Sequence, residues 1–189
     1  MADLLYLSYW IDGSTEHNML RAFEKALRLF PVSRLNRNPS TLRITPIADA
    51  EPPLYEEAFA PGFAAEEVVA AAKEFPHADS CYQFDTSWDL WQFEKDWSLE
   101  PSRVSLFCYG PEFEHDTGEN LRVDFGVDAN FLPLDAVPSA LNMAQSNIRS
   151  LLKFVHDLDD ALNARRRQLW TESGESFVER LQRVLKEVA

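Results

Sequence analysis

The chain has 189 residues, of which 46% are hydrophobic and 12% aromatic, enough apolar surface for a folded core, and this composition excludes a disordered protein. Its 31 acidic and 18 basic residues give a formal charge of −13, which argues against direct nucleic-acid binding. The apolar run at 4–11 ends at Asp12 and follows no basic leader, so we expect neither a signal peptide nor a membrane span.

The acidic residues are concentrated in the middle of the chain. Residues 49–135 hold 20 Asp and Glu against 4 Lys and Arg, whereas the segments before and after carry net charges of +2 and +1. Because such a segment repels itself, the functional interpretation is a basic partner or a bound metal ion. The alternative is that the charge serves solubility alone.

The first half of the chain predicts strands and helices in alternation. Residues 4–11 are typical of a strand buried on both faces. After a turn, apolar residues recur at three- and four-residue steps up to Pro31, which indicates an amphipathic helix that Ser14 or Thr15 can cap. The pattern then predicts a half-buried strand over 41–45, a weaker strand over 54–59 and an Ala-rich helix over 64–75.

The next stretch has a clear two-residue period. Tyr82, Phe84, Trp88 and Leu90 are predicted to face the core, and the residues between them to face solvent. Asp89 is expected to cap a short helical piece in which Leu90, Phe93 and Trp97 share a side. Further strands are predicted over 104–109 and 121–127, joined by ten turn-rich residues, which favours an antiparallel meander.

The end of the chain predicts two helices. After Pro138 a heptad pattern indicates one long helix, with Leu141, Ile148, Val155, Leu162 and Leu169 in one seam position and Ala144, Leu151 and Leu158 in the other. Gly174 precedes a final helix with apolar residues Phe177, Leu181, Val184, Leu185 and Val188.

Together these elements predict a single α+β domain over 1–189. Residues 1–135 are expected to form a mainly antiparallel sheet with helices on one face, and residues 139–189 a C-terminal helical pair packed on it. The two early strand–helix–strand units favour a ferredoxin-like or split β-α-β arrangement. Cys81 and Cys108 fall in predicted strands, where a thiol is usually a small buried hydrophobe, and this favours a reducing cytoplasm.

The outward residues of the meander give the main hypothesis for a site. If the alternation holds, carboxylates gather on one open face beside exposed aromatic rings, which suits a basic protein surface. The candidate binding residues are Asp85, Asp89, Phe107, Tyr109, Glu112, Glu114, His115, Asp116, Asp124 and Asp128. The alternative is an ordinary solvated sheet face whose charges prevent aggregation.

A metal site is the second hypothesis. The run from Glu112 to Asp116 supplies metal-ligand types within five residues, and Asp124 and Asp128 follow on the next strand. Oxygen-rich sets of this kind suit Mg²⁺, Ca²⁺ or Mn²⁺. The run lacks the spacing of a calcium-binding hand, and a polar hairpin tip explains the same residues.

The sequence therefore predicts a cytoplasmic, non-catalytic interaction module that binds a basic partner, as an inhibitor, immunity or adaptor protein does. The alternative is a small metal-dependent enzyme or ligand-binding protein that uses carboxylates near 112–128. No nucleophile-elbow serine or glycine-rich phosphate loop is present, so catalysis has little support and no cofactor other than a divalent cation is expected. A homodimer through the C-terminal helices is a further hypothesis.

Overall fold

The computed structural model describes the backbone of residues 3–132 and 140–188 and the side chains of residues 3–132 and 142–183. Its centre is a seven-stranded sheet in the order β3-β2-β4-β5-β6-β1-β7, in which every neighbouring pair is antiparallel. The strands are β1 (Leu4–Ile11), β2 (Ser40–Pro46), β3 (Tyr55–Phe59), β4 (Ser80–Phe93), β5 (Trp97–Tyr109), β6 (Leu121–Val127) and β7 (Ala164–Thr171).

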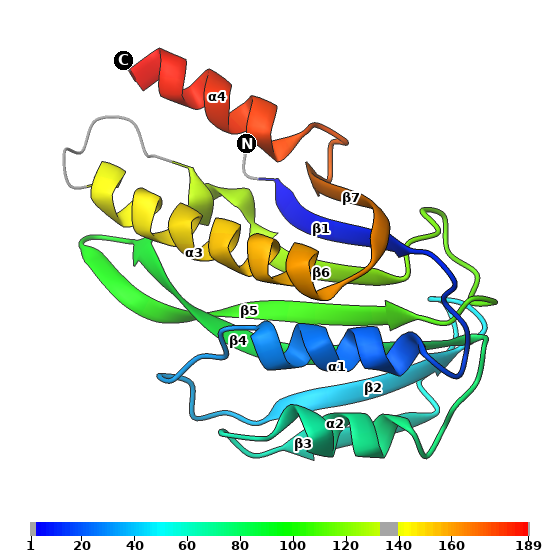
Figure 1. Cartoon of the computed structure of the whole chain (residues 1–189). Helices are drawn as coiled ribbons and strands as arrows, with labels where there is room; N and C mark the ends of the chain where they lie inside the picture. The colour runs from blue at the N-terminus through cyan, green and yellow to red at the C-terminus, as the bar shows by residue number, and fades with distance from the viewer. Residues whose placement is uncertain (1–2, 133–139, 189) are drawn as a thin grey trace.

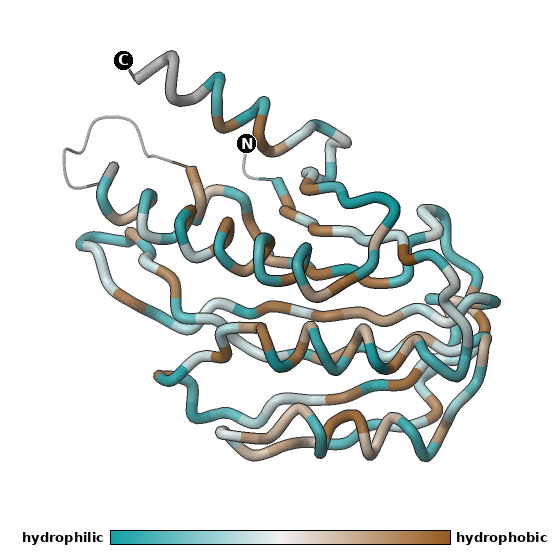
Figure 2. Tube along the Cα trace, viewed as in Figure 1, coloured by the Kyte–Doolittle hydropathy of each residue, from teal (hydrophilic) through white to brown (hydrophobic). Residues whose placement is uncertain are grey.

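Helices cover one face of this sheet. Figure 1 shows α1 (Met19–Leu29), α2 (Ala65–Ala72) and α3 (Ala140–Ala161) side by side on that face, and α4 (Phe177–Val188) beyond the β7 edge. The apolar positions along helices and strands, brown in Figure 2, supply a buried cluster that runs from Leu5 on β1 to Phe177 on α4. The predicted α+β class, with a mainly antiparallel sheet and helices on one face, is confirmed.

The connections are split β-α-β units. α1 joins β1 to β2, α2 joins β3 to β4, and α3 joins β6 to β7, and in each case the two strands run in the same direction with other strands between them. The central pairing is the β4–β5 hairpin, which extends beyond its neighbours. β2 pairs with β4 only up to Asp85 and β6 with β5 only from Ser105, so the far part of the hairpin pairs mainly with itself.

Two predicted helical segments are strands instead. The short helix expected after Asp89 is wrong, because β4 continues to Phe93 and turns directly into β5, where Trp97 pairs with Phe93. The heptad helix stops at Ala161, and Leu169 lies on β7 opposite Leu7 of β1. The C-terminal region is therefore a helix–strand–helix rather than a helical pair. β7 pairs with the edge of β1 that β6 does not occupy.

The remaining heptad positions pack as expected. Ala144, Leu151, Val155, Leu158 and Leu162 are buried, and Ile148 is partly buried against the core. Position Leu141 and, on the last helix, the side chains of Val184, Leu185 and Val188 lie outside the described side chains.

Candidate functional site

The opposite face of the sheet carries none of the helices that the structure describes (Figure 1). The strand phase predicted from the sequence is confirmed here, since Tyr82, Phe84, Trp88 and Leu90 belong to the helix-covered core. The residues between them therefore point to the uncovered face. We call this surface the uncovered face. The side chains on it that are described below come from β1, β2, β4, β5, β6 and β7.

Asp85 lies at the middle of a polar network on the uncovered face. Its carboxylate accepts hydrogen bonds from Ser105 Oγ at 2.6 Å and Gln83 Nε2 at 2.9 Å, and from the guanidinium groups of Arg43 and Arg103. Burial alone would raise the pKa of Asp85, but these hydrogen bonds and the two positive charges outweigh it and hold the pKa below its usual value. Glu56 accepts from the other side of Arg43 at 2.6 Å.

This network changes the electrostatic character expected for the face. Asp85 is charged, but two arginines compensate its charge, so the face here carries groups of both signs rather than a continuous acidic surface.

Asp124 differs from Asp85, because burial raises its pKa and its nearest hydrogen-bond donor is the backbone N–H of Gly126 at 2.9 Å. Asp89 accepts from the Ser33 hydroxyl and from the backbone N–H of Arg34 at 2.8 Å, so it fixes the loop before β2.

Aromatic rings and arginines alternate across the other half of the uncovered face. The Arg122 guanidinium lies 4.6 Å from the ring centre of Phe107 and 5.7 Å from that of Tyr6. Tyr6 in turn packs on Trp170 with ring centres 4.8 Å apart. Such stacked arginines and rings are the residue types enriched in protein interfaces.

The loop over residues 110–120 folds back over one end of the uncovered face. His115 stacks on Tyr109 with ring centres 4.2 Å apart, and Phe113 packs on the same ring. Tyr109 and Phe113 form a small apolar cluster with Cys81, separate from the main core. Burial raises the pKa of the Cys81 thiol, which makes it a packing residue rather than a nucleophile.

A buried ionic group lies beneath this loop. The Glu119 side chain is fully buried, with its carboxylate 3.7 Å from His115 Nδ1 and 3.6 Å from Arg122 Nη1. Neither Glu119 oxygen accepts a hydrogen bond from the described residues, and the Tyr109 hydroxyl also has none. Burial lowers the pKa of His115, and the negative charge of Glu119 opposes that shift. Buried polar groups without protein partners are usual positions for internal water.

Three loop segments meet beside this group, and together we call them the acidic loop end: residues 46–54, 77–80 and 110–119. The N–H of Glu114 donates to Ile47 O at 2.7 Å, the N–H of Ile47 to Asp79 O at 2.7 Å, and the N–H of Glu112 to Ala78 O at 2.8 Å. The three segments contain no lysine or arginine. Their carboxylates, apart from buried Glu119, belong to Asp49, Glu51, Asp79, Glu112, Glu114 and Asp116.

Backbone strain marks the same place. Ile47 has φ of 67°, a left-handed conformation that β-branched residues rarely adopt, and its side chain is 50% exposed. Both backbone hydrogen bonds of Ile47, to Asp79 and from Glu114, hold it there. Strain of this kind persists only where the surroundings fix it, and it is often found at functional positions.

The candidate residues from the sequence fall into three places. Asp85, Asp89, Phe107 and Asp124 lie on the uncovered face, and Glu112, Glu114, His115 and Asp116 belong to the acidic loop end. Tyr109 lies on the same side of β5 as Phe107 but is fully buried against Phe113 and His115, so the prediction that its ring is exposed is wrong. Asp128 lies at neither, because it is buried in the turn η1 (Asp128–Phe131) and paired with Arg180 of α4 at 2.9 Å.

The carboxylates between 112 and 128 are therefore not gathered around one point. β6 separates Glu119 from Asp128, and seven strand residues span roughly 20 Å. Among the described residues, no group of three or more His, Cys, Asp or Glu side chains is placed to hold a metal ion.

Sequence reasoning missed the residues that compensate the carboxylates. Arg43 and Asp85 are 42 positions apart and Asp128 and Arg180 are 52 apart, so no local pattern pairs them. It also missed Asp49, Glu51 and Asp79. The first two lie in the β2–β3 loop, which meets the β5–β6 loop through the bridge between Ala48 and Glu114, and Asp79, in the segment before β4, is joined to them by the hydrogen bond from the N–H of Ile47.

Comparisons with known proteins give no relative: no protein family, no curated protein and no solved structure matches this chain. Within the part of the chain that the structure describes, none of the helices has the length and apolar character needed to cross a membrane.

Proposed function

We propose that this chain is a non-catalytic protein-interaction module whose partner presents basic side chains to the acidic loop end. The observation that carries the proposal is the joining of three loops, none with a lysine or arginine, into one acidic surface by backbone hydrogen bonds. The partner would extend from there over the aromatic part of the uncovered face, around Phe107 and Tyr6.

Preorganisation supports this proposal. Because backbone hydrogen bonds hold the three loops, little conformational entropy would be lost when a partner binds. Ile47 offers an exposed apolar contact among the carboxylates, and Phe107, Tyr6 and Trp170 offer half-buried rings. Apolar anchors surrounded by charge are the usual composition of a protein-binding surface.

Charge supports a basic rather than an acidic partner. Asp49, Glu51, Glu112, Glu114 and Asp116 are all exposed. A surface of one sign steers an oppositely charged partner and makes association strongly dependent on salt. Cys81 and Cys108 are free and buried, which supports action in a reducing compartment such as the cytoplasm.

A peptide-binding experiment tests the proposal. The probe is a fluorescein-labelled twelve-residue peptide that alternates arginine with serine and contains one tryptophan, and a peptide with glutamate in place of arginine is the negative probe. Anisotropy titrations at low and high salt measure the affinity. We expect saturable binding of the basic probe alone, weakened at least tenfold between about 20 and 300 mM salt.

Matched variants locate the binding. The substitution set Glu112→Gln, Glu114→Gln and Asp116→Asn removes three charges from the acidic loop end. The control set Glu94→Gln, Asp96→Asn and Asp160→Asn removes the same charge from exposed positions away from the proposed surface. We expect the first set to weaken binding about tenfold and the control set less than twofold. Equal losses for both sets would show attraction by net charge only and would refute the proposed surface.

A further inference from the structure

At the other end of the uncovered face lies a polar hollow of about 500 Å³. Its walls come from the loop before β2 and from β2, β4 and β5, and they include Asn36, Asn38, Thr41, Arg43, Asp85 and Arg103. It is separated from the acidic loop end along β4, because Asp85 is five residues from Ser80 and a strand advances about 3.3 Å per residue. We call it the arginine hollow.

The loop that forms one wall is held by its own side chains. Ser33 Oγ accepts the backbone N–H of Asn36 at 2.8 Å and donates to Asp89. Asn36 Nδ2 donates to Ser87 Oγ at 3.0 Å, and Asn36 Oδ1 accepts the N–H of Asn38 at 3.0 Å. These bonds fix the loop against β4, so the arginine hollow is formed before any ligand arrives.

Hydrogen-bond donors remain available inside this hollow. The Arg103 side chain is 73% exposed and directs Nη2 to Asp85 at 3.0 Å, and its remaining N–H groups have no partner among the described residues. Arg43 uses Nε for Glu56 and Nη1 for Asp85, which leaves Nη2. The side-chain amide of Asn38 and the hydroxyl of Thr41 also line the hollow. Neither makes a hydrogen bond with any described side chain or backbone group.

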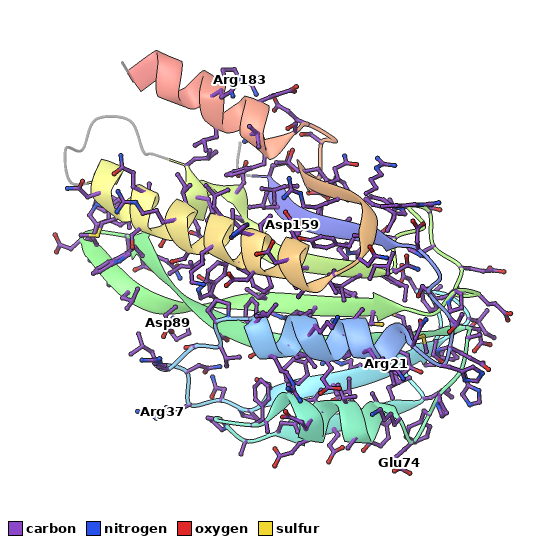
Figure 3. The ribbon with its side chains drawn as sticks, in the orientation of Figure 1. Arg21, Arg37, Glu74, Asp89, Asp159 and Arg183 are labelled. Atoms are coloured by element: carbon purple, nitrogen blue, oxygen red, sulfur yellow. The ribbon has the colours of Figure 1, made fainter. Side chains whose placement is uncertain are left out.

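The charges around this hollow differ from those of the whole chain. Arg34 and Arg37 are exposed on the wall loop, and Figure 3 shows Arg37 on the same side of the molecule as Asp89. The nearby carboxylates of Asp85 and Asp89 already accept hydrogen bonds from the protein. On a chain with a formal charge of −13, an arginine-rich hollow is the place where an anion would be attracted.

We propose that the arginine hollow binds a small polar ligand through a phosphate or carboxylate group. Arg103 and Arg43 would share the oxyanion, in the paired geometry that guanidinium groups favour, and Asn38 and Thr41 would contact the polar body of the ligand. The volume is in the usual range of small-molecule sites. This site is independent of the acidic loop end.

Calorimetric titration with defined anions tests this proposal. The probes are inorganic phosphate, citrate and ribose 5-phosphate, each compared with sodium chloride at the same ionic strength. We expect saturable binding of at least one probe and a rise in melting temperature that follows its concentration. Preference for the two phosphates or for citrate identifies the oxyanion. The absence of saturable binding by all three would overturn the proposal.

Arg103→Gln should weaken that binding about tenfold, because it removes a charged hydrogen-bond donor. The control Arg165→Gln removes an equally exposed arginine from β7 and should leave the affinity unchanged. Asn38→Ala changes an exposed loop position and should weaken binding about threefold. It is the second test if Arg103→Gln alters the fold.

Equal effects of Arg103→Gln and Arg165→Gln on the affinity would overturn the site. The acidic loop end variants should bind the anion normally, so this proposal and the proposed function fail separately.

Discussion

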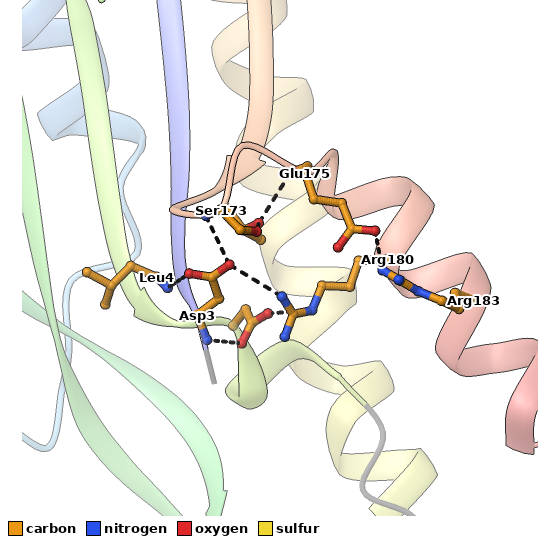
Figure 4. A network of polar contacts seen from close by, with 8 residues as sticks. Asp3, Leu4, Ser173, Glu175, Arg180 and Arg183 are labelled. Atoms are coloured by element: carbon orange, nitrogen blue, oxygen red, sulfur yellow. Dashed lines mark hydrogen bonds and ion pairs between the residues drawn. The ribbon is translucent and has the colours of Figure 1, made fainter. Parts of the chain in front are cut away.

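The guanidinium of Arg180 lies 2.9 Å from the buried carboxylate of Asp128 and joins the last helix to the turn that follows β6 (Figure 4). Asp128 is only 1% exposed in its side chain, and Arg180 also contacts Asp3 at 3.4 Å. The backbone N–H of Asp3 donates to Asp128 at 3.0 Å, and the N–H of Ser173 donates to Asp3 at 3.1 Å. The residue before β1, the turn after β6 and the first part of α4 therefore meet at one carboxylate pair.

Removing this arginine should destabilise the fold. Arg180→Met leaves the buried charge of Asp128 without its cation, and we expect a loss of about 2–3 kcal/mol in the free energy of unfolding. The control Arg183→Met breaks an exposed ion pair with Glu175 and should cost less than about 0.5 kcal/mol. Urea unfolding of both variants measures the difference, and similar losses would contradict the role given to Arg180.

Asp85 should make stability depend on pH in the acid range. Its folded-state pKa is lowered, so the unfolded chain binds the proton more readily and the stabilisation is lost as the pH falls through about 4 and below. Asp85→Asn should cost about 1–2 kcal/mol at pH 7 because Arg43 and Arg103 lose their shared acceptor. The gap between wild type and variant should narrow toward pH 3. A gap that stays constant between pH 7 and 3 would show that Asp85 titrates normally.

His115 should add a second pH dependence at higher pH. Burial lowers its folded-state pKa below the usual 6.5, so protonation favours the unfolded chain and stability falls as the pH drops through 6.5. The charged groups around it are Glu119, Asp49 and Asp116, which oppose the shift, and Arg122, which adds to it. His115→Gln should reduce the fall in melting temperature between pH 7.5 and 5.5. The control His77→Gln changes an exposed histidine, and an equal reduction there would rule out His115 as the cause.

Gly110 should tolerate no side chain. A Cβ atom there would lie 2.2 Å from the carbonyl oxygen of Ala78, a backbone atom that cannot move without breaking the loop contact. We expect Gly110→Ala to cost about 3 kcal/mol. Gly118→Ala has open space but a φ of 68°, so it should cost only about 1 kcal/mol. Thermal unfolding of the two variants separates steric conflict from backbone strain, and equal shifts would contradict the close approach at Gly110.

The sequence predicted the faces of the strands better than their ends. Hydrophobic alternation placed Phe84 inward and Asp85 outward correctly, since a two-residue period is a local property. The same run contains Leu90, Phe93 and Trp97, whose spacing also fits a helix, and only the pairing across the β4–β5 hairpin shows that the segment is a strand. Leu169 also fits the heptad pattern of α3, but in the structure it lies on β7, which pairs with the free edge of β1.

The candidate site was harder to predict than the fold. The sequence located acidic residues and aromatic rings, but their compensation depends on contacts between distant segments. Asp85 meets Arg43 because β2 and β4 are neighbours, and the segment around Ile47 meets Glu114 because two loops share one edge of the sheet.

The position of β1 has a consequence for how the protein is made. β1 precedes the other six strands of the sheet in the sequence, yet it pairs with β6 on one side and with β7, the last strand of the sheet, on the other. During translation its outer edge has no partner until residue 171 has left the ribosome, so the sheet is completed only after its other six strands have emerged. Pairings between such distant segments slow the search for the native state, and a nascent chain that stops before β7 would expose an edge prone to aggregation.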